Sequence, residues 1–298
     1  MTSDLVTQLE GTVVHHGYAQ LESVRLHYVE AGSGPLVLLL HGFPEFWYGW
    51  RRQIPALVNA GFRVVAPDLR GYNLSDKPRG VDAYRMRPLV NDVAGLIRAC
   101  GAKRAHLVGH DWGAVVAWAF AMRRPELLDR LVVLNGPHPA SFLRELRHLR
   151  QLRKSWYMFF FQLPWLPEAL ARKRRFAMLM YPFRRDPKRP GTFDERDRER
   201  YAAAFDQPGA LTSMINYYRA MFRRKGSGRL RSISRKIERP VLVVWGDGDR
   251  YLGRVLAQPD PRLVPNATVE YLSGVSHWVH HERPDEVNAL MVDFLRRL

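Results

Sequence analysis

A short turn around Asp111 is the feature of the sequence that most directly predicts chemistry. Residues 109–113 read Gly-His-Asp-Trp-Gly, between an apolar run and a helical stretch. The two glycines allow a strand-to-helix turn that is too sharp for larger side chains, and such a turn exposes its central residue as a nucleophile. Aspartate is also a common helix N-cap, but the strand-turn-helix context favours the nucleophile.

A carboxylate nucleophile predicts a reaction at a saturated carbon. It reacts poorly with a carbonyl, but it can displace a leaving group and form an alkyl ester with the enzyme. Water must then attack the ester, so negative charge develops on the Asp111 carbonyl oxygen itself. The expected donors to this oxyanion are the backbone N–H groups of Trp112 and of Phe43, which lies in the loop after Pro35–Leu40. Because Pro44 has no N–H and sits in a tight turn, we expect a cis Phe43–Pro44 bond.

A base and an acid are expected further along the chain, because proteins with this turn follow the order nucleophile, acid, histidine. His277 follows the last strand-like run, in Gly-Val-Ser-His-Trp, and is the predicted base. Asp249 follows the run Val241–Trp245 and is predicted to orient that histidine, with Asp247 as the alternative. The other place for an acid, after an earlier run, holds Asn135, which cannot carry the charge.

The remaining histidines near these motifs have simpler interpretations. His110 is expected to be a packed, hydrogen-bonded neighbour, and His280 and His281 to lie at the start of a surface helix. A metal site built on His277 and His281 would need further ligands in a motif that the sequence does not contain. We therefore expect neither a metal nor a cofactor.

The elements that must position these residues alternate between strand and helix. Short runs rich in Val and Leu predict strands buried on both faces of a parallel sheet. These runs are Pro35–Leu40, Arg63–Ala66, His106–Gly109, Leu131–Leu134, Val241–Trp245 and Thr268–Leu272. The helices expected from the pattern are Leu89–Ala99, Ala114–Met122 and Pro284–Leu298. This alternation predicts an α/β fold with a mostly parallel sheet flanked by helices.

The middle of the chain interrupts this pattern. Residues 137–235 contain no clear strand run and read as several helices. We therefore expect a core domain of residues 1–136 and 236–298 and an inserted helical cap, or lid, of residues 137–235. Arg144, Arg147, Arg150 and Arg153 recur every three residues, which predicts one solvated helical face.

Composition excludes several classes of protein. The 298 residues include 46 Lys and Arg against 29 Asp and Glu, which gives a net charge of +17. No nucleic-acid-binding motif accompanies this charge, so we attribute it to an arginine-rich surface and expect no nucleic-acid partner. The single cysteine, Cys100, excludes a disulfide framework and fits a reducing cytoplasm. The start has no signal-peptide pattern, and the longest apolar stretch, Ala114–Met122, is too short to span a bilayer.

Taken together, these motifs resemble those of the α/β-hydrolase superfamily and, within it, the soluble epoxide hydrolases. The resemblance covers most of residues 20–136 and 237–298. Its specific pieces are HGFPEFWYGWRRQ (41–53), PDLRGYNLSDKP (67–78), GHDWG (109–113), WGDGDRYLG (245–253) and GVSHW (274–278). The resemblance implies hydrolysis of an epoxide to a vicinal diol without a cofactor. Asp68 and Arg70 lie in a loop shared across the family, and we interpret them as structural.

Two lid tyrosines complete the site in the family that this sequence resembles, where they donate hydrogen bonds to the epoxide oxygen. Tyr157 precedes a Phe-Gln-Leu-Pro run, and Tyr218 lies in Asn-Tyr-Tyr-Arg, with Tyr217 as the fallback. The simpler alternative is that these are packing aromatics. Apolar walls of the substrate site are expected from Phe43, Trp47, Trp112 and Trp278.

Other functions use parts of the same pattern. Haloalkane and haloacid dehalogenases share the Asp nucleophile, but haloacetate dehalogenases carry Arg at the position of Trp112. A non-catalytic binding protein would not need Asp111, Asp249 and His277 together. The expected partners are thus an apolar epoxide and water, and the expected state is a monomer or a homodimer.

Overall fold

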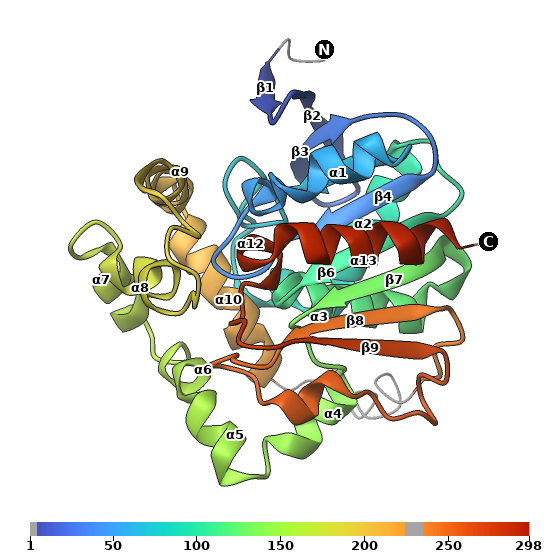
Figure 1. Ribbon diagram of the computed structural model, residues 1–298. Coiled ribbons are helices and arrows are strands. Elements are labelled where there is room, and N and C mark those ends of the chain that lie inside the picture. Colours follow the sequence, from blue (N-terminus) through green and yellow to red (C-terminus); the bar gives the residue numbers. More distant parts are fainter. Residues whose placement is uncertain (1–4, 224–234, 298) are drawn as a thin grey trace.

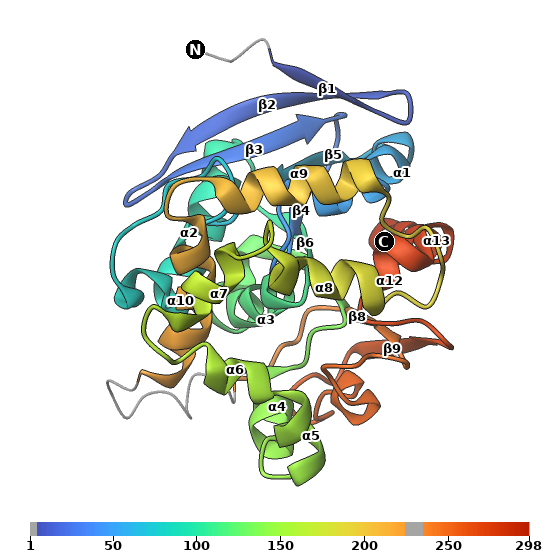
Figure 2. The ribbon, with the colours of Figure 1, turned by 90° about the vertical axis from the view of Figure 1, so that its left-hand side faces the viewer.

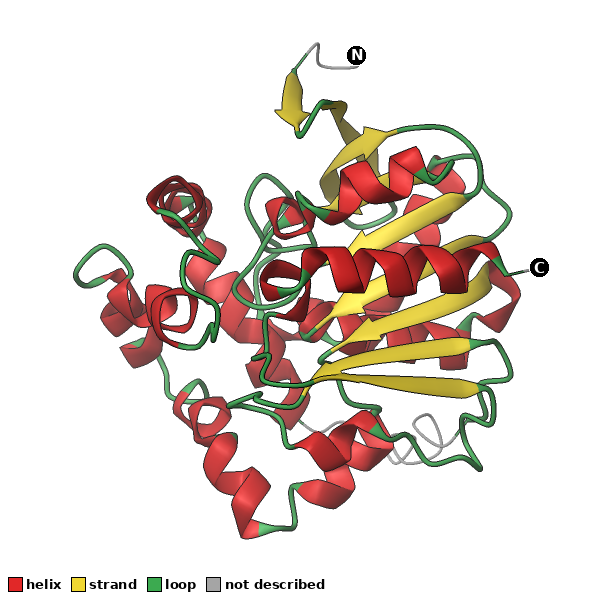
Figure 3. Ribbon diagram, viewed as in Figure 1, coloured by secondary structure: helices red, strands yellow, loops and turns green. Residues whose placement is uncertain are grey.

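A mostly parallel sheet forms the centre of the molecule (Figures 1 and 3). Across residues 5–223 and 235–297, which the computed structural model describes, nine strands follow the order β1-β2-β3-β5-β4-β6-β7-β8-β9. They are β1 (Val6–Leu9), β2 (Thr12–Gln20), β3 (Arg25–Ala31), β4 (Leu36–Leu40), β5 (Arg63–Pro67), β6 (Ala105–His110), β7 (Leu128–Leu134), β8 (Val241–Gly246) and β9 (Ala267–Leu272). The strand pairs from β5 to β9 in this order are all parallel. The pairs β1 with β2, β2 with β3, and β3 with β5 are antiparallel.

The parallel strands match the sequence prediction, and the first three strands were missed. Every residue of β4, β6 and β8 is buried, because helices cover both faces of the sheet there. In β2, buried residues are separated by exposed ones such as His15 and Gln20, so this strand has no continuous apolar run. A prediction from continuous apolar runs therefore misses strands that have one solvent-exposed face.

Helices cover both faces of the sheet. The core helices are α1 (Gln53–Asn59), α2 (Met86–Ala99), α3 (Trp112–Arg123), α12 (Val279–Glu282) and α13 (Pro284–Arg296), and the 3₁₀ helices are η1 (Trp47–Trp50), η2 (Val81–Tyr84), η3 (Pro125–Leu127) and η4 (Arg254–Ala257). Helices α1 and α13 lie on one face, and α2 and α3 lie on the other (Figure 1). The predicted closing helix ends at Arg296, and Leu298 lies outside the described residues.

Seven helices follow β7 and lie beyond the carboxyl ends of the parallel strands (Figures 1 and 2). We call them the helical segment: α4 (Pro139–Glu145), α5 (Leu149–Lys154), α6 (Trp156–Phe160), α7 (Leu166–Arg172), α8 (Ala177–Arg185), α9 (Glu195–Asp206) and α10 (Ala210–Phe222). No strand occurs in its described part, residues 137–223; residues 224–234 of the predicted insertion lie outside the description. No helix in the described ranges is long and apolar enough to cross a membrane.

The arginine repeat does not form one helical face. Helix α4 ends at Glu145 and α5 begins at Leu149, so the repeat is divided between two helices and the turn that joins them. All four of its arginines are exposed, as predicted for solvated side chains.

Buried polar contacts fasten α9 to the core. Asp197 accepts hydrogen bonds from Arg51 Nη2 at 2.8 Å and from the Tyr48 hydroxyl at 3.0 Å. Tyr201, one turn further along α9, donates its hydroxyl hydrogen to Glu45 Oε1 at 3.0 Å. These donors and acceptors are buried, so each bond satisfies a group that water cannot reach.

Candidate active site

The turn at Asp111 has the sharp geometry that its glycines predict. Strand β6 ends at His110 and α3 begins at Trp112, and Asp111 between them has a φ of 48°. A Cβ at Gly113 would come within 1.9 Å of the carbonyl oxygen of Leu40, so only glycine allows α3 to approach β4 this closely. A non-glycine residue at positive φ is uncommon, and such strain is concentrated at functional positions.

The Asp111 carboxylate lies between a backbone donor and a histidine. The N–H of Phe43 donates to Asp111 Oδ1 at 2.8 Å, and His277 Nε2 lies 3.7 Å from Oδ2. The Phe43–Pro44 bond is cis, which confirms the prediction. Phe43 thus lies where an oxyanion donor is needed, and the donor role of the Trp112 N–H stays a prediction.

Asp249 is the acid that reaches His277. Its Oδ2 lies 2.7 Å from His277 Nδ1 and accepts a hydrogen bond from Asn135 Nδ2 at 2.7 Å. Its Oδ1 accepts from the N–H groups of Tyr251 at 2.7 Å and Leu252 at 2.9 Å. Both carboxylate oxygens are therefore satisfied, and Nδ1–H donation to Asp249 leaves His277 Nε2 facing the nucleophile.

The alternative acid, Asp247, has a different neighbour: its Oδ1 accepts a hydrogen bond from the N–H of Gly274 at 2.8 Å. The position of Asn135 also becomes clear. It follows β7, where an acid was considered, and it supports the Asp249 carboxylate instead of replacing it.

The charges around His277 determine its protonation. Burial alone would lower the pKa of this imidazole, but the carboxylates of Asp249 and Asp111 raise it to about 9. Burial would raise the pKa of Asp249, but His277 and its other hydrogen-bond donors hold it below its usual value. His277 is therefore an imidazolium at neutral pH.

Both predicted tyrosines lie beside this triad. The Tyr157 and Tyr218 rings are 5.8 Å apart, and Tyr218 also packs edge-on against Trp112 at 5.2 Å and Phe43 at 5.1 Å. Burial and the nearby Asp111 carboxylate raise the pKa of Tyr157, and burial raises that of Tyr218 well above its usual value. Both hydroxyls therefore keep their protons and can donate them.

The fallback tyrosine, Tyr217, is already engaged elsewhere. Its hydroxyl donates to the backbone carbonyl of Arg70 at 2.8 Å, and its ring is fully buried. This hydrogen bond links α10 to the core. The Tyr217 hydroxyl is therefore occupied, and Tyr218 is the one of the two neighbouring tyrosines that lies near Asp111.

Trp278 and Trp47, both predicted to form apolar walls of the substrate site, have different surroundings in the structure. The Trp278 ring packs against His277 at 5.2 Å and against Phe183 of α8 at 4.9 Å. The Trp47 ring packs edge-on against His16 of β2 at 5.4 Å, and the backbone N–H of Trp47 donates to Asp68 Oδ1. The described contacts of Trp47 thus belong to the core near β2, and it is not proposed as a wall of the site.

The loop residues interpreted as structural have structural contacts. Asp68 Oδ2 accepts hydrogen bonds from His27 Nδ1 at 2.7 Å and Asn73 Nδ2 at 2.9 Å, and Arg70 forms a buried ion pair with Asp92.

Two further aromatic residues pack against the predicted site residues, and the sequence analysis did not predict them. Phe161 packs against Phe43 at 5.5 Å and Tyr218 at 5.0 Å, and Tyr251 packs against Tyr157 at 5.7 Å and His277 at 5.6 Å. Phe161 follows Tyr157 by one helical turn, and Tyr251 lies two residues after Asp249. Closeness in sequence to a predicted catalytic residue was therefore the signal that could have identified Phe161 and Tyr251.

A buried polar cluster around Glu45 lies directly behind His277. Glu45 accepts hydrogen bonds from His281 Nε2 at 2.7 Å, His110 Nδ1 at 2.9 Å and the Tyr201 hydroxyl at 3.0 Å. Burial would raise the pKa of Glu45, but these histidines hold it well below its usual value. His110 Nε2 also lies 3.1 Å from the carbonyl oxygen of His277, so His110 is the packed neighbour that was predicted.

The expectation for His280 and His281 was wrong. Both are fully or almost fully buried, because the short helix α12 lies beneath the helical segment and not at the surface. Glu45, His280 and His281 have ligand atoms within 4.8 Å of one another, which is a metal-like spacing. However, His281 Nδ1 lies 3.2 Å from Arg51 Nη1, so His281 accepts there and Nε2 donates to Glu45. A cation and an inward-facing N–H oppose a metal ion at this position.

Replacing Glu45 by alanine is expected to lower the free energy of unfolding by about 3 kcal/mol or more, because three buried donors would lose their acceptor. Urea denaturation followed by fluorescence measures this change. The exposed Glu238 is the matched control, and Glu238→Ala should change stability by less than about 0.5 kcal/mol. Equal effects of the two substitutions would show that the cluster contributes nothing specific.

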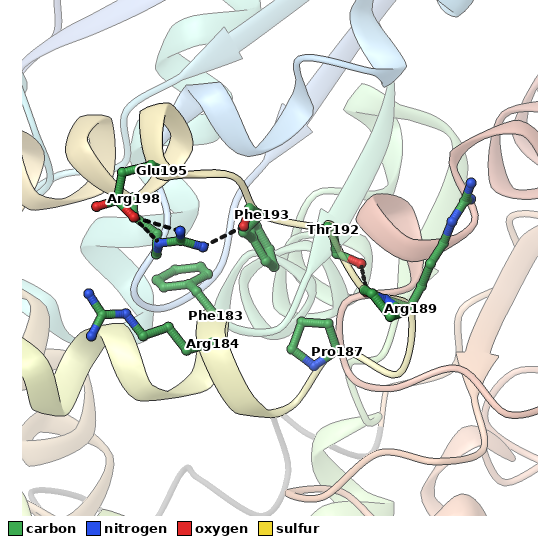
Figure 4. Close-up of a pocket in the computed structure, with 10 residues that line it drawn as sticks. Phe183, Arg184, Pro187, Arg189, Thr192, Phe193, Glu195 and Arg198 are labelled. Atoms are coloured by element: carbon green, nitrogen blue, oxygen red, sulfur yellow. Dashed lines mark hydrogen bonds and ion pairs between the residues drawn. The ribbon is translucent and has the colours of Figure 1, made fainter.

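A separate cavity of about 410 Å³ lies between α8 and α9 (Figure 4). Its walls include Phe183, Arg184, Glu195 and Arg198, and Arg198 is already bonded to Glu195 and to the carbonyl of Phe193. It contains none of the Asp111, Asp249 or His277 side chains, and its Glu195 carboxylate is paired with Arg198, so we do not assign the reaction to it.

The fold and this triad define a class of protein. The chain belongs to the α/β hydrolase fold family, whose model matches residues 35–284. It is 44% identical over 283 residues to the AB hydrolase superfamily protein YfhM of Bacillus subtilis, which covers 94% of this chain and 97% of that one. It is 38% identical over 291 residues to epoxide hydrolase 4 of Homo sapiens, covering 94% and 79%. Within the α/β hydrolases, the chain belongs to the epoxide hydrolases.

A solved structure agrees with this assignment. The crystal structure of Bacillus megaterium epoxide hydrolase in complex with an inhibitor is similar to this chain with a TM-score of 0.84 and 35% identity. The similarity covers 94% of this chain and all of that one.

Proposed function

We propose that this enzyme hydrolyses a small apolar epoxide to a vicinal diol through an ester on Asp111. The observation that carries the proposal is the meeting of an aspartate nucleophile, a carboxylate-bound histidine and two protonated tyrosines at one point. The names of the relatives support the substrate class. In this proposal the helical segment is a cap that supplies the tyrosines.

The first step opens the ring. Tyr157 and Tyr218 donate hydrogen bonds to the epoxide oxygen while Asp111 attacks one ring carbon from the opposite side. A carbon–oxygen bond to Asp111 forms, the ring carbon–oxygen bond breaks, and the resulting alkoxide takes the hydroxyl proton of one tyrosine, which regains a proton from solvent. The high pKa values of the tyrosines favour this role, because their hydroxyls remain protonated donors in a site with little water.

The second step hydrolyses the ester. Ester formation removes the negative charge of Asp111, which is one of the three carboxylate charges, with Asp249 and Glu45, that raise the pKa of His277. The pKa of His277 therefore falls, the imidazolium releases its proton to solvent, and the neutral imidazole becomes a base that can deprotonate water. Water attacks the Asp111 carbonyl, the Phe43 and Trp112 N–H groups stabilise the oxyanion, and collapse releases the diol and restores the carboxylate.

The proposal is tested with a panel of aryl and alkyl epoxides and the purified full chain, with diol formation as the readout. Diol formed only when Asp111 is present would support it. Halide release from haloalkanes or haloacids, without diol from any epoxide, would instead assign a dehalogenase activity to the same triad.

Removal of both tyrosine hydroxyls is expected to slow ring opening by about 10³-fold or more, whereas each single Phe substitution should cost about 10- to 100-fold. Single-turnover formation of the ester in Tyr157→Phe, Tyr218→Phe and the double variant measures this. Tyr217→Phe is the matched control, because its hydroxyl bonds Arg70 and not the substrate. It should lose about 1 kcal/mol of stability and keep its ring-opening rate. An unchanged rate in the double variant would refute the role of the pair.

A further inference from the structure

Helices α5 and α6 expose an apolar stripe to solvent. They follow one another with only Ser155 between them, and Ser155 continues the helical hydrogen bonding from Gln151. The stripe consists of Leu149 (70% exposed), Leu152 (36%), Trp156 (64%) and Phe159 (45%). Within each helix the two exposed side chains are three residues apart, so Leu149 and Leu152 share one face of α5, and Trp156 and Phe159 share one face of α6. These two pairs make up the stripe.

On the opposite side of α5, and at Ser155, the side chains that face the core are polar, whereas α6 buries the apolar Met158. Gln151 Nε2 donates to Ser155 Oγ at 3.0 Å and to the carbonyl of Tyr251 at 2.8 Å. Gln151 Oε1 accepts from the N–H of Gly253 at 3.0 Å, and Lys154 Nζ donates to the carbonyl of Asp249 at 2.7 Å. The usual orientation of an amphipathic helix is thus reversed. Turning the stripe inward would break these bonds, so the apolar face is held outward.

The stripe continues onto neighbouring elements. Leu163 (43% exposed) and Trp165 (72%) follow it in the turn before α7, and Phe222 at the end of α10 packs against Phe159 at 5.4 Å. We call this set, with the stripe, the apolar face. An exposed set of this size, with two tryptophans, is unusual for a surface with no partner.

Positive charge surrounds the apolar face. Residues 144–175 contain nine Lys and Arg and two Glu. Both glutamates are in ion pairs, Glu145 with Arg144 and Glu168 with Arg219, whereas Arg150 and Arg153 flank the stripe in solvent. Two copies of such a face would repel each other, whereas a negatively charged surface would be attracted.

We propose that the apolar face docks on the surface of an anionic lipid bilayer. Tryptophan side chains favour the boundary between headgroups and acyl chains, and arginines favour lipid phosphates. Docking does not depend on the proposed reaction. If that reaction is correct, docking also places Tyr157, the neighbour of Trp156 on α6, close to the bilayer in which apolar epoxides dissolve.

The test is co-sedimentation of the full chain with vesicles of phosphatidylcholine alone and of phosphatidylcholine mixed with phosphatidylglycerol. We expect binding to the anionic vesicles and at least about tenfold weaker binding to the neutral ones. Trp156→Ala combined with Phe159→Ala should weaken binding about tenfold or more. Both side chains are exposed, so the fold should be retained, which thermal unfolding checks.

A matched pair of variants separates this face from general charge attraction. Arg150→Glu with Arg153→Glu should abolish binding, whereas Arg104→Glu with Arg124→Glu carries the same net charge and should bind like the parent chain. Arg104 and Arg124 are exposed and lie near the amino ends of β6 and β7, away from the helical segment. Equal losses in the two pairs, or no binding of the parent chain, would overturn the proposal. So would sedimentation showing a dimer that Trp156→Ala with Phe159→Ala dissociates, because the face would then join two copies.

Discussion

An Asp111→Ala variant is expected to lose diol formation by about 10⁴-fold or more, because no other group can form the ester through which the proposed reaction passes. The structure leaves little room for a substitute. The atoms nearest to the carboxylate are the Phe43 N–H, which is a donor, and His277 Nε2, which is 3.7 Å away and needed as the base. Steady-state diol production from an aryl epoxide, followed by chromatography, measures the loss.

Asp247→Ala is the control for this result. Asp247 lies in the same group of strand-end loops, and its carboxylate binds the N–H of Gly274 instead of a catalytic group. It should therefore keep most of its activity. A thermal unfolding midpoint close to that of the parent chain will show that the Asp111 variant is folded. An Asp111→Ala protein that still turns over epoxides at near the parent rate would exclude the covalent mechanism.

A His277→Gln variant is expected to open the epoxide and then stop. Ring opening needs Asp111 and the tyrosines, which remain, whereas hydrolysis loses its base and should slow by about 10³-fold. The protein should therefore gain the mass of one substrate molecule. Intact-protein mass spectrometry after mixing with excess epoxide measures this, and digestion should place the added mass on Asp111.

The exposed His148 at the start of α5 provides the control, since His148→Gln should turn over without accumulating the ester. Rapid multiple turnover by His277→Gln would contradict the assigned base. A variant that neither turns over nor gains mass would place His277 in ring opening as well.

The raised pKa of His277 has a consequence for stability. Its pKa is about 9 in the folded protein and 6.5 in the unfolded chain, so protonation favours the folded state. The contribution is fully present below pH 6.5 and is lost as the pH rises through about 9. We expect the free energy of unfolding of the parent chain to fall over this window by a few kcal/mol more than that of His277→Gln. Denaturant titrations at several pH values test this, and parallel curves for the two proteins would contradict it.

The positions of the triad and of Phe43 could be predicted because the sheet brings them together. Asp111, Asp249, His277 and Phe43 each follow a parallel strand, and the carboxyl ends of parallel strands meet at one edge. The order of the strands therefore predicts that residues up to 234 positions apart in the sequence lie close together in space. The sequence analysis favoured Asp249 over Asp247, and the contacts in the structure agree, because Asp249 lies against His277 whereas Asp247 binds the N–H of Gly274.

Burial of α12 could not be predicted in this way. In the sequence, His280 and His281 are polar residues followed by the charged Glu282 and Arg283, which is typical of a helix start at the surface. Their contacts in space are Glu45, Trp50 and Arg51, which come from the loop and turn after β4. The sequence contains no local signal for that packing, and the same holds for Trp47, whose partner His16 lies on a strand that was missed.

The polar fastening of α9 affects how parts of this enzyme could be exchanged with those of a relative. An apolar contact tolerates a substitute of similar size, but the Asp197 and Tyr201 bonds each require a particular partner in the core. A chimaera that takes only the helical segment from another protein would leave the buried Arg51 without its carboxylate partner and would remove one hydrogen-bond donor from the buried Glu45. Recombination across this boundary therefore has to transfer four residues as one unit: Glu45, Arg51, Asp197 and Tyr201. In this enzyme, the smallest exchangeable module is larger than the inserted segment itself.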